Sequence, residues 1–230
     1  YALRDVTGTV DSIPLIASSV MSKKLASGAQ AILLDVKVGS GAFMKNIEDA
    51  RELAKAMVDI GKENGRSVKA ILTDMDRPLG HAIGNALEIR EVINTLKGHG
   101  PEDLTHECII MAAHMLVLSH ICDYEAALNR VQQALDSGTA LERLRLMIEA
   151  QGGDSRVIDD DRVLTIGKFT YDETSPQDGY ITHMNTERCG IASVMLGAGR
   201  TVKDVPIDYI ECIVMHKITG DAVSMGERIA

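Results

Sequence analysis

The sequence predicts an α/β protein in which a parallel or mixed sheet is flanked by helices. Two short apolar runs, residues 29–39 and 67–75, lack the strict alternation of a one-sided strand and suit strands covered on both faces. Between them, residues 47–65 form an amphipathic segment with acidic residues in its first turn and a glycine at its end. This order of strand, helix and strand predicts a right-handed crossover between two parallel strands.

The first helix is expected from about Ser12 to Ser27. Asp11 or Ser12 supplies the N-cap, Pro14 suits the first turn, and Gly28 ends the helix.

One stripe of this helix holds four residues within ~100° of one another at the helical period: Ile16, Ser19, Val20 and Lys23. A lysine in this place can snorkel at the helix end, where its charge suits the helix dipole. Alternatively, Ser19 and Lys23, joined by Arg4 from the preceding turn, supply donors that suit a polar, planar ligand rich in carbonyl oxygens. The pattern alone favours the first interpretation and leaves the second open.

The loop after the first apolar run reads GSGAF, residues 39–43. Glycine amides at a helix N-terminus attract anions, but this loop matches neither the dinucleotide fingerprint nor the phosphate loop that ends in Lys-Ser/Thr. A plain turn from strand to helix is therefore favoured, with Asn46 capping the helix that follows.

Beyond Pro78 the pattern changes to successive helices. The segment 101–121 is apolar on most sides, so we expect it to be buried. The polar, glycine-marked residues 152–164 read as a connection between domains, and from Lys168 onward the sequence becomes strand-like with turn signals. The other expected helices cover residues 86–96, 123–138 and 139–153.

A bent loop, RPLGHAIG, precedes the helix that carries Glu88 and Glu91. Such a loop can point the backbone carbonyls of Leu79 and Ala82 at a cation, with Glu91 closing the shell of oxygen ligands. From the pattern alone, a simple capping loop is the better interpretation.

Composition excludes several classes of protein. The chain has 230 residues, 45% of them hydrophobic, and a net charge of −9, which disfavours binding to nucleic acid or to an anionic membrane. No apolar run reaches transmembrane length. The four cysteines form no CxxC pair, and the seven histidines show no metal-ligand spacing, so we expect a cytoplasmic protein with reduced thiols.

Two long motifs resemble the pyrimidine-nucleoside phosphorylase and thymidine phosphorylase family. They are YALRDVTGTVDSIPLIASSVMSKKLASGAQAILLDVKVGSGAFMK at the start of the chain and TDMDRPLGHAIGNALEIRE from residue 73. The similarity continues through LGAGR and KITGDAV. The resemblance implies reversible phosphorolysis of a pyrimidine nucleoside such as thymidine, uridine or deoxyuridine, with inorganic phosphate as co-substrate and no organic cofactor.

The resemblance also implies a set of site residues. Arg4, Ser19 and Lys23 match the residues that hold the pyrimidine base, and Tyr1 and Ile16 line the same pocket. Arg4 and Lys23 would stabilise the negative charge that develops on the departing base. Bacterial members bind a potassium-like monovalent cation, and its ligands match the carbonyls of Leu79 and Ala82 and the carboxylate of Glu91. That match reverses the preference for a simple capping loop.

The fold that the resemblance implies has three parts. Residues 1–26 would be one piece of a split helical domain, which also forms the homodimer contact; residues 27–163 would be the α/β domain, and residues 164–230 an incomplete C-terminal α+β domain. The family's phosphate-binding stretch precedes the position of Tyr1, so this chain is expected to be an internal fragment that is inactive alone. A phosphoribosyltransferase of related fold and a non-catalytic binding module remain as alternatives.

Overall fold

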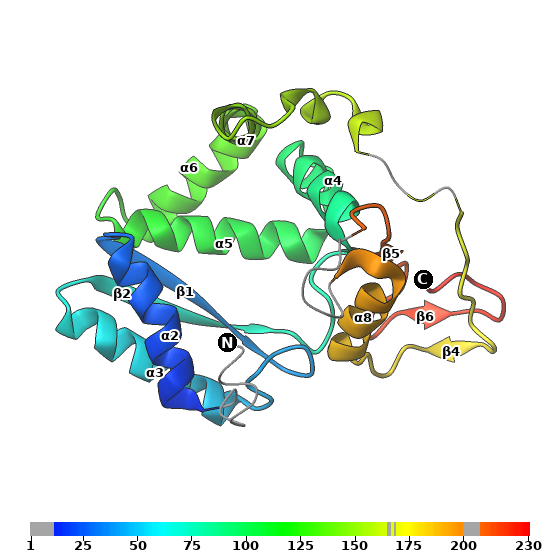
Figure 1. Cartoon of the computed structure of the whole chain (residues 1–230), viewed down its shortest axis with the longest axis horizontal. Helices are drawn as coiled ribbons and strands as arrows, with labels where there is room; N and C mark the ends of the chain where they lie inside the picture. Colours follow the sequence, from blue (N-terminus) through cyan, green and yellow to red (C-terminus); the bar gives the residue numbers. More distant parts are fainter. Residues whose placement is uncertain (1–11, 165–166, 168, 200–207) are drawn as a thin grey trace. The chain divides into compact units, whose positions relative to one another are not determined.

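The structure, a computed structural model, describes residues 12–164, 167, 169–199 and 208–230 of the chain. Figure 1 draws the chain coloured along its sequence. Contacts between residues divide it into two compact units. The first unit comprises Tyr1–Asp76 and Ile109–Arg130, and the second comprises Arg77–Cys108 and Val131–Ala230. The division into three domains along the sequence therefore remains a prediction about the family fold.

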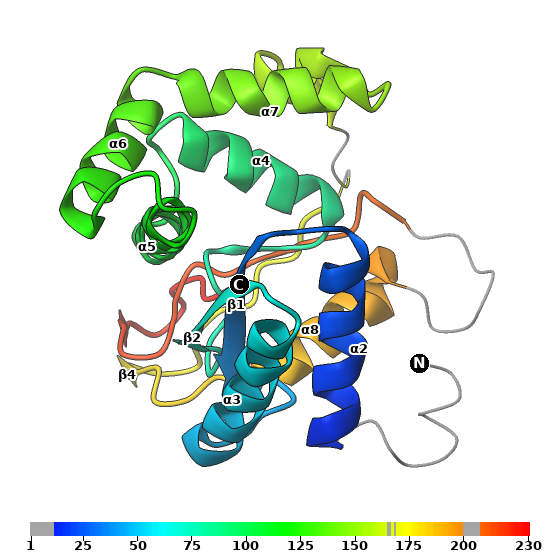
Figure 2. The same cartoon turned by 90° about the vertical axis from the view of Figure 1, so that its left-hand side faces the viewer.

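The first unit is built on two parallel strands, as the sequence predicts. Strand β1 (Ala31–Val38) pairs in parallel with β2 (Ser67–Asp74), with Ala31 opposite Ser67 at one end of the register. Helices α2 (Ile13–Ala26) and α3 (Ile47–Glu63) pack against this sheet (Figure 2). One face of the strands and the two helices share a hydrophobic core that includes Ile16, Met21, Ile32, Leu34, Val36, Leu53, Met57 and Val68.

The boundaries of the two helices follow from local chemistry. In α3, the Asn46 side chain accepts a hydrogen bond of 2.9 Å from the Asp49 N–H, which confirms the predicted N-cap. Helix α2 starts directly after Ser12, carries proline in its first turn and is followed by Gly28 at φ +79°. Ser12 is the N-cap of α2 by position, but its side chain makes no capping hydrogen bond. The boundaries depend on residues close in sequence, which is why the sequence predicts them.

The other face of the sheet is more polar than the prediction of two covered faces implies. Asp35 is exposed and forms an ion pair of 2.8 Å with Lys37, and the Thr73 hydroxyl donates a hydrogen bond to the same carboxylate. The apolar residues on this face are half-buried rather than buried. The described residues thus bury the strands on one face only.

Helix α5 (Glu102–Leu118) also differs from its prediction. Of its residues only Ala113 is buried, and Met115 is 56% exposed, so the expectation of a buried helix is wrong. An apolar helix needs packing partners on most of its sides, and the described chain does not supply them. Helix α5 is followed by α6 (Tyr124–Asp136).

The second unit contains helix α4 (Asn85–Leu96), helix α7 (Thr139–Ala150) and a core of Ile93, Val157 and Ile158. Residues 152–164, which the sequence predicts to be a polar connection, instead form two short 3-10 helices, Ser155–Ile158 and Asp161–Val163, and supply two of these core residues.

The C-terminal part is α+β, as predicted, but it is less strand-like than the sequence indicates. Three short strands are present among the described residues from Gly167 on: β4 (Gly179–Tyr180), β5 (Ile213–Val214) and β6 (Ala222–Val223). Strand β4 pairs with β6, and β5 pairs with β3 (Ala82–Ile83), both antiparallel. Helix α8 (Thr186–Ser193) was not predicted, although the Asn185 side chain caps it by accepting a hydrogen bond from the Arg188 N–H. Lys168, where the strand-like pattern begins, lies outside the described residues.

Candidate functional site

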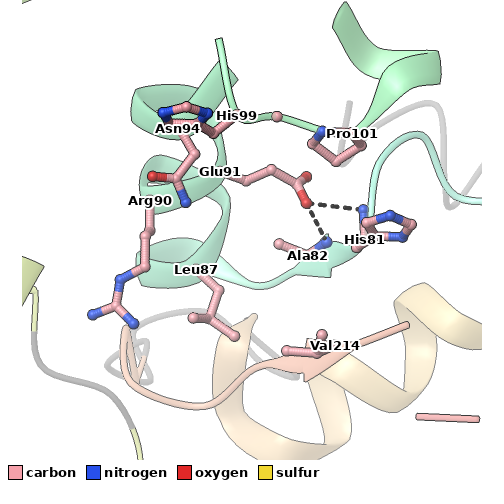
Figure 3. Close-up of a pocket in the computed structure, with 10 residues that line it drawn as sticks. His81, Ala82, Leu87, Arg90, Glu91, Asn94, His99, Pro101 and Val214 are labelled. Carbon is pink, nitrogen blue, oxygen red and sulfur yellow. Dashed lines mark hydrogen bonds between the residues drawn. The ribbon is translucent and has the colours of Figure 1, made fainter. Parts of the chain in front are cut away.

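The bent loop before α4 is held by a single carboxylate. Oε1 of Glu91 accepts hydrogen bonds from the backbone N–H groups of His81, at 2.9 Å, and Ala82, at 3.1 Å (Figure 3). Gly80 adopts φ +72°, a left-handed conformation that glycine takes without strain, and its N–H donates to Asp103. The Glu91 carboxylate thus lies directly against the loop, and the predicted cation shell of Leu79, Ala82 and Glu91 remains a prediction.

The residues of the predicted cation site lie on this loop and on α4. Leu79, Ala82 and Glu91 are all half-buried, and the loop is within hydrogen-bonding distance of the carboxylate. Both backbone hydrogen bonds go to Oε1, so Oε2 of Glu91 has no hydrogen-bond donor among the residues described here. This oxygen is adjacent to Gly80. The site therefore offers one carboxylate oxygen, Oε2, without a described hydrogen-bond donor.

The N-terminus of α4 is anchored to the C-terminal part of the second unit. The Asn85 side-chain amide donates a hydrogen bond of 3.0 Å to the Ala198 carbonyl, and the Ala86 N–H donates to the Tyr209 carbonyl at 3.3 Å. Within the helix, the Glu88 side chain accepts the Gly84 N–H at 3.0 Å. These contacts fix the direction of α4, and thus the position of Glu91 along it.

A cavity of about 370 Å³ lies beside this loop (Figure 3). Glu91 and Ala82 contribute to its wall, together with polar side chains that the sequence did not single out as site residues: His81, Arg90, Asn94 and His99. His99 is placed by a backbone hydrogen bond of 2.8 Å from its N–H to the Asn94 carbonyl. The glycine and proline around His99 indicate a turn that returns to α4, a signal that could have identified it.

The residues predicted to hold a planar ligand lie on or before α2. Ser19 is half-buried and Lys23 is exposed, whereas Ile16 is 7% exposed and packs in the core of the first unit. The stripe of Ile16, Ser19, Val20 and Lys23 therefore runs from the core to the surface, and the role of Lys23 toward a planar ligand remains a prediction. The core faces the side of the helix that carries Ile16, Ala17 and Met21. Tyr1 and Arg4 lie outside the described residues.

Two further observations concern ions and membranes. Among the residues that the structure describes, no three His, Cys, Asp or Glu side chains are grouped in a way that could hold a metal ion. Nor does any described helix have the length and apolar character needed to cross a bilayer.

Comparisons with known proteins support the family resemblance that the sequence motifs indicate. Residues 1–141 match the family model described as "Glycosyl transferase family, a/b domain", and residues 180–230 match "Pyrimidine nucleoside phosphorylase C-terminal domain". The chain is 50% identical over its whole length to a pyrimidine-nucleoside phosphorylase of Geobacillus stearothermophilus and 52% identical to one of Staphylococcus aureus (strain bovine RF122 / ET3-1), and it covers 53% of each. These matches confirm the resemblance, and the chain spans about half the length of these relatives.

Proposed function

Because the chain belongs to the glycosyl transferase family whose α/β-domain model it matches, we propose that its gene product catalyses reversible phosphorolysis of pyrimidine nucleosides. The products would be the free base and a pentose 1-phosphate, with inorganic phosphate as co-substrate. The observation that carries this proposal is the 50% identity to a pyrimidine-nucleoside phosphorylase along all 230 residues. The match of residues 180–230 to the C-terminal domain of such enzymes favours phosphorolysis over a phosphoribosyltransferase activity.

We assign the pyrimidine base to Arg4, Ser19 and Lys23, with Tyr1 and Ile16 lining its pocket. The half-buried hydroxyl of Ser19 and the exposed ammonium of Lys23 lie one helical turn apart on α2, which supports their binding one ligand. Cationic donors next to the base would stabilise the charge that develops as the glycosidic bond breaks, and this effect grows when water is excluded. Thymidine, uridine and deoxyuridine all present the carbonyl oxygens that these donors recognise.

We infer that a potassium-like cation binds the Leu79 and Ala82 carbonyls and the Glu91 carboxylate. The support is the Glu91 carboxylate seated on the loop, with Oε2 left for an ion. Bound there, the cation would link loop and helix electrostatically and thereby stiffen this part of the second unit.

We propose that the gene product is a homodimer that contacts its copy through the helical domain and acts in the cytoplasm. The exposed Leu15 on α2, at 42%, is consistent with a covering partner. None of the four cysteines, all of which lie among the described residues, forms a disulfide, which suits a reducing compartment.

The proposal is tested by incubating the full gene product with uridine, thymidine or deoxyuridine and measuring release of free base with and without phosphate. Base release that requires phosphate supports it, and release without phosphate, or no release, contradicts it. The isolated 230-residue chain serves as a second sample. It should be inactive, because alignment of base and phosphate supplies much of the rate and the family's phosphate-binding stretch precedes Tyr1.

A further inference from the structure

In the first unit, a lysine and a histidine are directly hydrogen-bonded. Nζ of Lys69, on β2, lies 2.9 Å from Nδ1 of His114, on α5. An ammonium group has only donors, so Nδ1 of His114 must be the acceptor. The imidazole is therefore neutral and carries its proton on Nε2.

A third side chain fixes the orientation of this imidazole. The rings of His114 and Tyr124 are stacked, with centroids 4.7 Å apart and planes inclined by 29°. Burial, and to a smaller extent the charge of Lys69, lowers the pKa of His114 below its ordinary value. At neutral pH the ring thus presents an unprotonated nitrogen, held in position, to an exposed lysine.

We propose that Lys69 is a modification site, an amine that His114 activates for acylation by small acyl phosphates. The Lys69 ammonium first loses one proton through His114 Nδ1 to solvent, and the resulting neutral amine attacks the acyl carbonyl carbon. A C–N bond forms while the bond from that carbon to the phosphate oxygen breaks, and phosphate leaves. The nitrogen's second proton then passes to His114 Nδ1 and on to solvent, so that the lysine becomes a neutral amide. An adjacent base is the usual means of activating such a nucleophile.

The surroundings of Lys69 distinguish it from other lysines of the same unit. Lys55 and Lys62, on α3, are exposed like Lys69. Within the described part of the chain, neither has a hydrogen-bonded imidazole or any other side-chain partner; the described histidine–lysine hydrogen bond belongs to Lys69. All three lysines are exposed, and the neighbouring imidazole is the difference. The proposal is independent of the proposed nucleoside chemistry.

The test is treatment of the purified 230-residue chain with acetyl phosphate, with acetylation of each lysine followed over time by peptide mass spectrometry. Lys69 should react about tenfold faster than Lys55 and Lys62. An equal or slower rate at Lys69 overturns the proposal, and this comparison needs no variant.

Two substitutions of His114 distinguish its action as a base from its action as a hydrogen-bond acceptor for Lys69. His114→Asn places an amide oxygen where it can accept from Lys69 but cannot take up a proton, and His114→Phe keeps the stack on Tyr124 without any acceptor. Both should reduce the Lys69 rate to that of Lys55 and Lys62, and an unchanged circular dichroism spectrum of each variant reports an intact fold. A fast Lys69 in either variant would show that exposure or hydrogen bonding, and not a base, determines the reactivity, and would overturn the proposal.

Discussion

Glu91 accepts two backbone hydrogen bonds from the loop and is also the proposed cation ligand, and two substitutions distinguish these roles. Glu91→Ala removes the acceptor of the His81 and Ala82 N–H groups, which lie 2.9 and 3.1 Å from Oε1. Hydrogen bonds to a charged group contribute about 1.5–3 kcal/mol each, and the His81 bond is exposed, so we expect a loss of about 2 kcal/mol in the free energy of unfolding. Glu91→Gln retains an acceptor oxygen for both N–H groups and should cost less than about 1 kcal/mol.

The assay is urea denaturation of the full gene product and both variants, in potassium and in a bulky organic cation such as tetramethylammonium. Potassium should stabilise the parent protein, and both variants should lose this stabilisation because a neutral amide attracts the ion less than a carboxylate. Equal stability of the Gln and Ala variants would refute the structural part of the reasoning. A parent protein that is indifferent to the cation would refute the assignment of the ion to this loop.

Two further predictions concern stability. Asn46→Ala should lower the free energy of unfolding by about 1 kcal/mol in denaturation experiments, since it removes the N-cap acceptor of the Asp49 N–H, whereas Asn46→Asp, which keeps that acceptor, should change it little. Because the pKa of His114 is lowered in the folded chain, the unfolded chain binds more protons as the pH falls below the ordinary value of 6.5, so stability should decrease on acidification. His114→Phe should remove this component of the decrease between pH 7.5 and 5.5, measured by denaturation at each pH, and an identical decrease in parent and variant would contradict it.

The features of the fold that depend on neighbours in sequence were predictable. Asn46 indicates the start of α3, and Gly65, at φ +71°, follows the end of this helix. The parallel pairing of β1 with β2 follows from the intervening helix. By contrast, the exposure of Met115 on α5 depends on which elements cover that helix, and no local pattern carries this information.

In the candidate site, too, the features that depend on neighbours in sequence were easier to predict than those that depend on the rest of the fold. Sequence reasoning grouped Glu91 with Ala82 because the loop directly precedes the helix, but it placed a cation between them and did not predict their direct hydrogen bond. The exposure of Lys23 was not predictable. The helical period shows which residues of α2 share one side of the helix, but not which part of that side the core covers. His99 was missed because its position depends on a turn that closes back on Asn94 after the helix has ended.

The most direct test of the account compares two adjacent lysines of α2 in the full gene product. Lys23 and Lys24 are both exposed in the last turn of the helix, so Lys23→Met and Lys24→Met have similar costs in helix propensity and charge. Phosphate-dependent release of uracil from uridine should fall by a factor of about 30 or more in Lys23→Met, the equivalent of about 2 kcal/mol of lost transition-state stabilisation, and by less than about threefold in Lys24→Met. Turnover of Lys23→Met within about threefold of the parent, or an equal loss in both variants, would contradict the assignment of Lys23 to the pyrimidine base.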